Sequence, residues 1–168
     1  WRALDDRIKP IHQQNIGLTM SLIRGCDAAK GEFIARQDCG DISLPGRFCR
    51  QLKLLKADEF LSFVSCWTRV CAESGEELYL SKGSGVAVRP MHVLDLSARY
   101  SVVDGPTHHG GVMFRRAAYV RAGGYRPEFY YGQDWDLWYR LAEQGRFQML
   151  EDVFYEARIA VTDISMNN

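Results

Sequence analysis

Apolar residues recur along the chain at the four-residue spacing that places them on one face of a helix. Leu18, Leu22 and Cys26 follow this spacing. The pairs Leu137–Leu141 and Trp138–Ala142 repeat it later in the chain. Capping residues and glycines mark where such helices begin and end. We therefore predict four helices: Gly17 to Lys30; one that begins at Pro45, is capped by Ser43 and buries Phe48, Leu52 and Leu55; 116–122; and 134–144.

Runs rich in β-branched and aromatic residues predict short strands between these helices. The predicted strands cover 8–12, 33–36, 60–68, 111–114, 148–150 and 153–157. We interpret the Gly- and Ser-rich stretch 81–105 as a loop that contains a short helix over 91–97. Because strands alternate with helices and no linker divides the chain, we predict an α/β sheet flanked by helices, in a single domain spanning 1–168.

The composition is that of an ordinary globular domain. The 168 residues are 46% hydrophobic and 25% charged, which argues against disorder and a coiled coil. Because 21 Lys and Arg balance 21 Asp and Glu, no global field attracts nucleic acid, and we expect no nucleic-acid partner. The five cysteines are an odd number without a CxxC pair, so we expect reduced thiols in a cytoplasmic protein.

Two aspartates follow the predicted strand 33–36 directly. Asp38 and Asp41 lie three residues apart on a turn that contains Gly40. Ligands of open α/β sheets bind beyond the carboxyl ends of strands, and paired carboxylates there can hold Mg²⁺ or Mn²⁺. Since no Cys ligand pair or His stands close in sequence, we expect the site to prefer these cations over Zn²⁺. The alternative is an Asp- and Gly-rich turn without a ligand.

A third carboxylate, Asp134, stands at the start of the predicted helix 134–144. The positive end of the helix dipole favours its ionised form, which can act as a general base. The alternative is that Asp134 only caps the helix. Trp135 is either a platform for the face of a sugar or a core residue, whereas for Trp138 we favour the core.

The neighbouring pair His108 and His109 offers a further polar group. Adjacent side chains in an extended segment point to opposite faces, so the pair cannot easily chelate one metal ion. We favour a structural role for the pair, with His109 as a candidate to hydrogen-bond a substrate hydroxyl.

In their order and spacing, these segments resemble a family 2 glycosyltransferase over nearly the whole chain. The matching segments are Asn15–Gly17, Ala29–Asp41, Pro45–Gln51, Val112–Arg116, Gly123–Arg126, Gln133–Leu141 and Gly145. The resemblance implies a GT-A fold with a mixed sheet, a nucleotide-sugar donor and a divalent cation. It implies that Asp38 and Asp41 match the metal and donor motif, that Gly17 and Arg36 also contact the donor, and that Asp134 matches the base of inverting members.

The sequence departs from the family pattern in three places. Gly40 stands where the metal motif often has a further Asp, which leaves open whether Asp38 or Asp41 touches the metal. Gln133 stands where Glu is common, so Asp134 has one like charge fewer beside it. The family domain begins with a strand and a Ser/Asp-rich turn that we do not find after Trp1. We therefore expect the first half of the nucleotide pocket to be missing, and dimerisation or poor solubility to follow from an uncovered sheet edge.

Taken together, the sequence predicts a metal-assisted, inverting glycosyltransferase. Asp134 acts as base, Asp38 and Asp41 hold Mg²⁺ or Mn²⁺, and Trp135 and His109 contact the acceptor. The expected partners are a nucleotide sugar and a saccharide or lipid-linked acceptor, with the inner membrane face and a second copy of the chain as options. Two alternatives stay open: a non-catalytic nucleotide-sugar-binding subunit, and a metal-dependent phosphoryl or nucleotidyl transferase.

Overall fold

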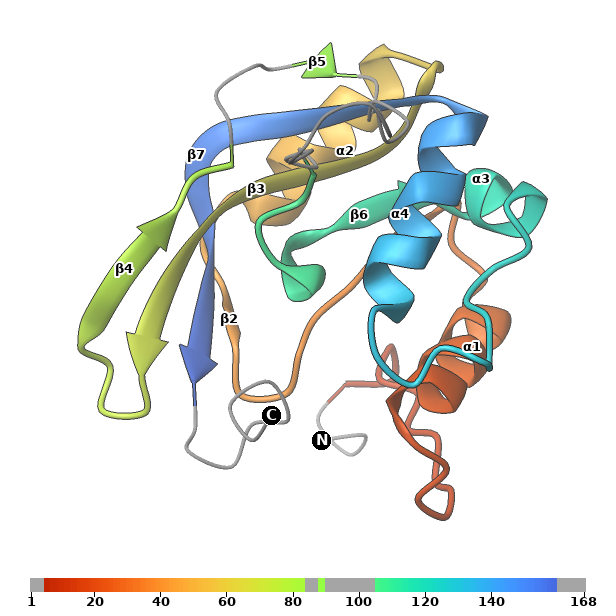
Figure 1. Cartoon of the computed structure of the whole chain (residues 1–168), viewed down its shortest axis with the longest axis horizontal. Coiled ribbons are helices and arrows are strands. Elements are labelled where there is room, and N and C mark those ends of the chain that lie inside the picture. The colour runs from red at the N-terminus through yellow and green to blue at the C-terminus, as the bar shows by residue number, and fades with distance from the viewer. Residues whose placement is uncertain (1–4, 84–87, 90–104, 160–168) are drawn as a thin grey trace, which may run out of the picture.

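The computed structural model describes residues 5–83, 88–89 and 105–159. These residues form a mixed sheet with helices on both faces (Figure 1). The predicted helix over 91–97 lies outside the described residues. The helices are α1 (Leu18–Ala28), α2 (Arg47–Ala57), α3 (Arg116–Arg121) and α4 (Gln133–Gln144), with one 3₁₀ turn at His109–Gly111. None of them has the length and apolar character that crossing a membrane requires.

Two long strands form the centre of the sheet. They are β3 (Leu61–Ala72) and β7 (Arg146–Ile159), which pair in parallel and curve together through the molecule (Figure 1). The path of the sheet is β1-β6-β3-β7-β2, with β4 paired to β3 and β5 to β7, and these other pairings are antiparallel. The shorter strands are β1 (Phe33–Ala35), β2 (Ile42–Ser43), β4 (Glu77–Ser81), β5 (Val88–Arg89) and β6 (Met113–Arg115).

The core lies on both faces of β3, because successive side chains of a strand point to opposite sides. Phe63 packs in a cluster with Leu137 and Leu141 of α4. Its neighbour Val64 packs in a second cluster with Leu55 of α2. Most of β3 is therefore buried, including the polar residues Ser62, Ser65 and Thr68 that interrupt its apolar sequence.

The structure confirms the four predicted helices and the α/β architecture, with differences at their ends. Helix α1 ends at Ala28, two residues before the predicted Lys30. Helix α2 begins after Gly46, which adopts a left-handed φ of 90°. The predicted cap, Ser43, is wrong, because this residue lies in β2. The predicted apolar face of α2 is confirmed at Leu55, which is buried, and at Leu52, which packs against the same cluster. It is wrong at Phe48, which is 48% exposed, and the polar residues Arg47 and Gln51 are buried beside it.

One strand prediction is wrong, and two predicted strands are parts of a single longer one. Residues 8–12 have irregular backbone and are exposed, so the apolar residues there contact no sheet. The predicted strands 148–150 and 153–157 are one strand, β7, whose pairing with β3 shifts register between Cys66 and Thr68. The polar residues Glu151 and Asp152, which lie between the two predicted strands, are exposed where the register shifts. Strand β4 was not predicted, because its residues lie on the surface.

The junction between α4 and β7 predicts the effect of two glycine substitutions. A Cβ on Gly145 would lie 2.5 Å from the carbonyl oxygen of Phe60, whereas one on Gly25 in α1 meets nothing within 4 Å. We expect Gly145→Ala to lower the free energy of unfolding by about 1–3 kcal/mol. We expect Gly25→Ala to raise it by up to about 1 kcal/mol, because alanine favours the helix. Urea denaturation of both variants measures the difference; equal midpoints would contradict this packing of the junction.

Candidate active site

The loop after β1 brings Asp38 and Asp41 together at one buried hydroxyl. Gly40 has a φ of 91°, a conformation that glycine adopts without strain, and it closes the turn between the two aspartates. The Tyr155 hydroxyl donates to Asp41 Oδ2 at 2.7 Å and accepts from the backbone N–H of Asp38 at 3.1 Å. Asp41 Oδ1 accepts from the backbone N–H of Arg158 at 2.9 Å. The end of β7 thus fixes the position of both aspartates.

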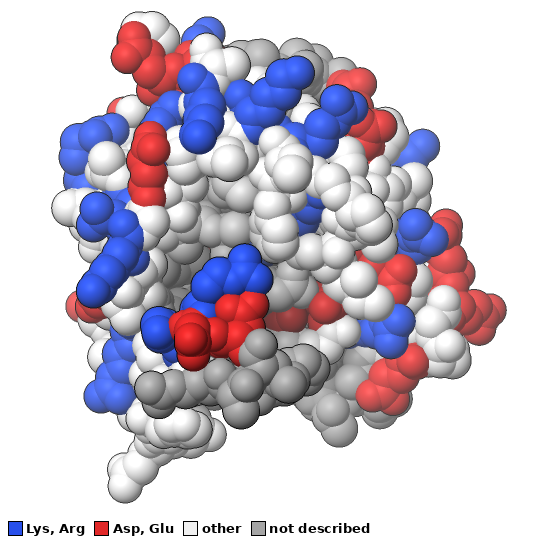
Figure 2. All heavy atoms as spheres, turned by 180° about the vertical axis from the view of Figure 1, so that it is seen from behind, with Lys and Arg blue, Asp and Glu red and all other residues white. Residues whose placement is uncertain are grey.

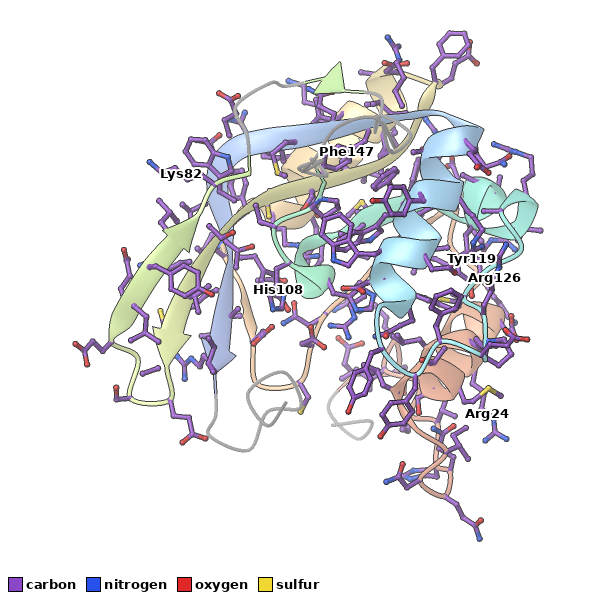
Figure 3. The ribbon with its side chains drawn as sticks, viewed as in Figure 1. Arg24, Lys82, His108, Tyr119, Arg126 and Phe147 are labelled. Atoms are coloured by element: carbon purple, nitrogen blue, oxygen red, sulfur yellow. The ribbon has the colours of Figure 1, made fainter. Side chains whose placement is uncertain are left out.

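His108 completes a cluster with the two aspartates. One ligand atom from each of the three side chains lies within 4.8 Å of the others. The imidazole ring stacks on Tyr155, with ring centroids 5.2 Å apart, and its Nδ1 accepts from the backbone N–H of Gly110 at 3.1 Å. Burial lowers the pKa of His108, so the ring is neutral, which is the form that binds metal ions. Figure 3 places His108 between the sheet and α4.

Two carboxylates and a neutral imidazole fit a divalent cation such as Mn²⁺. Whereas the sequence suggested oxygen ligands alone, His108 arrives from 67 residues beyond Asp41. An imidazole nitrogen also suits Zn²⁺. The predicted preference for Mg²⁺ or Mn²⁺ over Zn²⁺ assumed that no histidine lies near the aspartates, and the structure removes that assumption. The sequence contains little indication that His108 is a ligand, since nothing in the local spacing links this histidine to the aspartates.

A buried cation, Arg36, stands beside the acidic pair. Its side chain forms an ion pair with Asp38, and the residue is 7% exposed. Its Nε finds no hydrogen-bond partner among the described residues. Burial lowers the pKa of Arg36, because the charged form loses hydration. A guanidinium with unused donors beside a cavity can bind an anionic group.

A cavity of about 690 Å³ is lined by most of the residues that the sequence singled out. The predicted site residues on its wall are Arg36, Asp38, Asp41, His109, Asp134 and Trp135. Further lining residues are Thr107, His108, Tyr130, Tyr131 and Arg158. Gly17 does not line it; it lies before α1 with a φ of 81°, and the next residue, Leu18, reaches the cavity. Acidic and basic side chains are interspersed around a hollow on the face seen in Figure 2, which agrees with the zero net charge.

Asp134 faces this cavity from the first turn of α4. The residue before the helix, at the N-cap position, is Gly132, with a φ of 70°. Asp134 Oδ1 accepts from the backbone N–H of Trp135 at 2.9 Å, so the side chain also satisfies one free donor of the helix end. Asp136 is held differently, because it pairs with Arg140 and, at 3.3 Å, with Arg126. Of these two carboxylates, only Asp134 lines the cavity.

The two histidines contact different groups, although His109 begins a 3₁₀ turn and does not lie in the extended segment that the sequence prediction assumed. His109 Nε2 lies 2.7 Å from the hydroxyl of Tyr125, and its ring packs edge-on against Trp138 at 6.2 Å. Burial holds the pKa of His109 well below its ordinary value. His109 therefore contributes a neutral ring at the cavity wall, while His108, for which the sequence favoured a structural role, contacts the acidic pair.

Exposed aromatic side chains form the rim of the cavity next to Asp134. Tyr130 and Tyr131 are 68% and 55% exposed, and their ring centroids lie 4.7 Å apart. Trp135 is 37% exposed and rests edge-on against Trp138, 4.9 Å between centroids. Trp138 is 2% exposed and belongs to the core, the reading that the sequence favoured. Exposed aromatic faces beside polar groups suit a ligand with both apolar and hydroxyl surfaces.

Comparison with known proteins gives a consistent picture. The sequence model described as "Glycosyl transferase family 2" matches residues 1–121. A Bacillus subtilis protein that carries a glycosyltransferase name, EpsE, is 31% identical over 91% of this chain and 53% of its own length. The amylovoran biosynthesis glycosyltransferase AmsE of Erwinia amylovora is 26% identical over 87% of this chain and 52% of its own length.

A third relative is named for its substrates. The UDP-Gal:alpha-D-GlcNAc-diphosphoundecaprenol beta-1,3-galactosyltransferase of Escherichia coli is 25% identical over 79% of this chain and 46% of its own length. The chain spans about half the length of the curated relatives it matches.

A solved structure shares the fold. The crystal structure of S. aureus TarS 1–349 has a TM-score of 0.57 at 16% identity, covering 88% of this chain and 42% of that chain. The likeness concerns the fold alone, and it confirms the GT-A-like mixed sheet expected from the sequence.

Removing the Tyr155 hydroxyl tests the cation site. We expect Tyr155→Phe to weaken Mn²⁺ binding by about 10- to 100-fold, as is typical when a hydrogen-bond partner of metal ligands is lost. Tyr119→Phe is the matched control, because the Tyr119 hydroxyl accepts from the backbone N–H of Tyr125 and lies apart from His108 (Figure 3). Calorimetric titration with Mn²⁺ measures both affinities. A Tyr155→Phe variant that binds Mn²⁺ as tightly as the Tyr119→Phe control would contradict this assignment.

Proposed function

We propose, since the chain belongs to glycosyl transferase family 2, that it moves a sugar from a nucleotide-diphosphate donor to a hydroxyl of a saccharide or lipid-linked acceptor, with inversion. One observation carries this proposal. A single cavity is lined by a cation-binding cluster on one wall and by a carboxylate at a helix N-terminus on another. Transfer from a diphosphate leaving group needs both, a stabiliser of negative charge and a base.

The donor diphosphate would lie against the wall formed by the loop 36–41. Asp38, Asp41 and His108 would hold Mn²⁺ or Mg²⁺, which when bound supplies positive charge to the departing diphosphate. Arg36, buried beside Asp38 and with unused donors, would bind a phosphate oxygen of the donor. Gly17, at the start of α1, is the remaining donor contact that we propose.

Asp134 would act as the general base. Its carboxylate takes the proton of the acceptor hydroxyl, whose oxygen forms a bond to the anomeric carbon from the face opposite the diphosphate. The bond from that carbon to the diphosphate oxygen breaks, and the nucleoside diphosphate leaves with the electron pair. The position of Asp134 in the first turn of α4, on the wall of the cavity, supports this role.

The acceptor would lie against the aromatic rim, with Trp135 under a sugar face and His109 near a hydroxyl. Tyr130 and Tyr131 extend the same rim. A lipid-linked acceptor is supported by the name of the E. coli relative, which contains a diphosphoundecaprenol substrate. With such an acceptor the reaction would take place at the cytoplasmic face of a membrane. A homodimer remains part of the proposal, and sedimentation of the purified protein tests it.

The base assignment is tested by Asp134→Asn in the complete gene product. The substitution keeps an oxygen that can accept the N–H of Trp135 but removes the base. We expect the transfer rate to fall by about 10²–10⁴-fold while nucleoside diphosphate affinity and stability persist. Release of nucleoside diphosphate from a panel of nucleotide sugars, with polyprenyl-diphosphate-linked and free saccharides as acceptors, measures the rate.

Asp136→Asn is the matched control, two residues away on the same helix. Its loss of the pairs with Arg140 and Arg126 lowers stability, but the rate per folded molecule stays within a few-fold of the parent. If the Asp134→Asn variant transfers sugar as fast as the Asp136→Asn control, Asp134 is not the base. Release of phosphate or pyrophosphate in place of sugar transfer would instead identify a phosphoryl or nucleotidyl transferase, and nucleotide-sugar binding without turnover a non-catalytic subunit.

A further inference from the structure

The largest fully buried side chain of the described residues is a cation, Arg47, the first residue of α2. Its relative exposure is 0%. In the described part of the chain, each hydrogen bond that Arg47 donates goes to an uncharged oxygen. Burial lowers the pKa of Arg47, since a guanidinium removed from water loses hydration that neutral acceptors only partly replace. A buried charge of this kind contributes little to stability, so its position needs another explanation.

The guanidinium joins the two segments that carry the ligands of the cation cluster. Its Nη2 donates to the carbonyl oxygen of Arg36 at 2.8 Å and to that of Gly110 at 2.6 Å. Arg36 comes two residues before Asp38, and Gly110 comes two residues after His108. One nitrogen atom therefore fixes the distance between the aspartate loop and the histidine turn.

Further contacts of Arg47 involve the residues that flank the aspartate turn and the ring of Tyr155. Its Nη1 donates to Ser43 Oγ at 2.7 Å and to Gln37 Oε1 at 3.1 Å, on either side of the aspartate turn. The guanidinium carbon lies 4.8 Å from the ring centroid of Tyr155, whose hydroxyl binds Asp41. Loop, turn and tyrosine are thus all positioned by one side chain that itself does not line the cavity.

We propose that Arg47 is a positioning residue for the cation cluster: it sets the separation of Asp38 and Asp41 from His108 without touching the ion. The proposal rests on the proposed cation site. It follows that a substitution that keeps the charge but loses the fork of donors should disturb the cluster. Lysine has its three donors on a single nitrogen atom, so it cannot bind the two carbonyls and at the same time the Gln37 and Ser43 side chains that Nη1 holds.

Arg115 offers a matched control. It too binds backbone carbonyls and stacks on an aromatic ring: its Nε donates to Leu61 O at 2.8 Å, its Nη2 to Asp58 O at 3.1 Å, and it lies 5.2 Å from the ring centroid of Phe33. These contacts join α2 to β3 and do not reach the cavity. A purely structural role would give Arg47→Lys and Arg115→Lys the same phenotype.

The experiment titrates Mn²⁺ alone into the parent, Arg47→Lys and Arg115→Lys proteins, and records their melting temperatures. We expect both variants to have lower melting temperatures. Only Arg47→Lys should bind Mn²⁺ at least 10-fold more weakly, which is the size typical of losing a residue that holds metal ligands in place. Ser43→Ala, which removes one acceptor of Arg47 at a surface strand, is the milder variant should Arg47→Lys not fold. It should weaken Mn²⁺ binding by a few-fold at an unchanged melting temperature.

The outcomes separate this proposal from the proposed function. If the parent binds Mn²⁺ and Arg47→Lys binds it as Arg115→Lys does, Arg47 is structural and the cation site stands. If Arg47→Lys does not fold, Mn²⁺ binding by Ser43→Ala equal to that of the parent overturns the proposal. If the parent binds no Mn²⁺, both the cation site and the role of Arg47 fall, while sugar transfer by Asp134 remains open to its own test.

Discussion

The hydroxyl group of Tyr155 is the contact on which the candidate site depends. It is buried, donates to Asp41 and accepts from the backbone of Asp38, so it holds both ends of the turn after β1. Its ring lies against His108 on one side and Arg47 on another. The packing leaves no space: a Cβ on Gly110 would lie 1.9 Å from this hydroxyl. The sheet therefore determines the geometry of the site, because Tyr155 lies beside the two aspartates only when β7 pairs correctly with both β3 and β2.

Protonation states around this tyrosine favour a divalent cation. Burial, together with the hydrogen bond to Asp41, raises the pKa of Tyr155, so it remains a donor at neutral pH. Burial lowers the pKa of His108, which leaves its ring neutral. The cluster then carries two carboxylates and no titrating cation of its own, with Arg36 as the charge paired to Asp38. Carboxylate oxygens and a neutral imidazole are ligands that suit a divalent cation, and such a cation supplies the positive charge that a diphosphate leaving group needs.

Sequence alone predicted the helices, the α/β class and the aspartates of the cavity wall, because helical spacing and the order of the turn motifs are local signals. Asp38, Asp41 and Asp134 were identified for that reason. The contacts of His108 and Tyr155 with the aspartates were not, since Tyr155 lies in β7, which pairs with β2 and β3, and His108 lies just before β6, which pairs with β1 and β3. The apolar face predicted for α2 was right at Leu55 and Leu52 but wrong at Phe48, because hydrophobic spacing does not reveal a buried Arg47, whose acceptors include backbone carbonyls of other segments. Long-range polar contacts are thus what the sequence did not reveal.

The central claim is that one cavity holds a cation at the aspartate–histidine cluster and a diphosphate beside it. A crystal structure with Mn²⁺ and a nucleoside diphosphate, with data collected at the manganese absorption edge, tests it most directly. The account predicts one anomalous peak within coordination distance of Asp38 or Asp41 and of His108, with phosphate oxygens completing the shell and one of them near Arg36. A fully bound nucleotide with no anomalous peak at this cluster, or with manganese elsewhere in the chain, would contradict it.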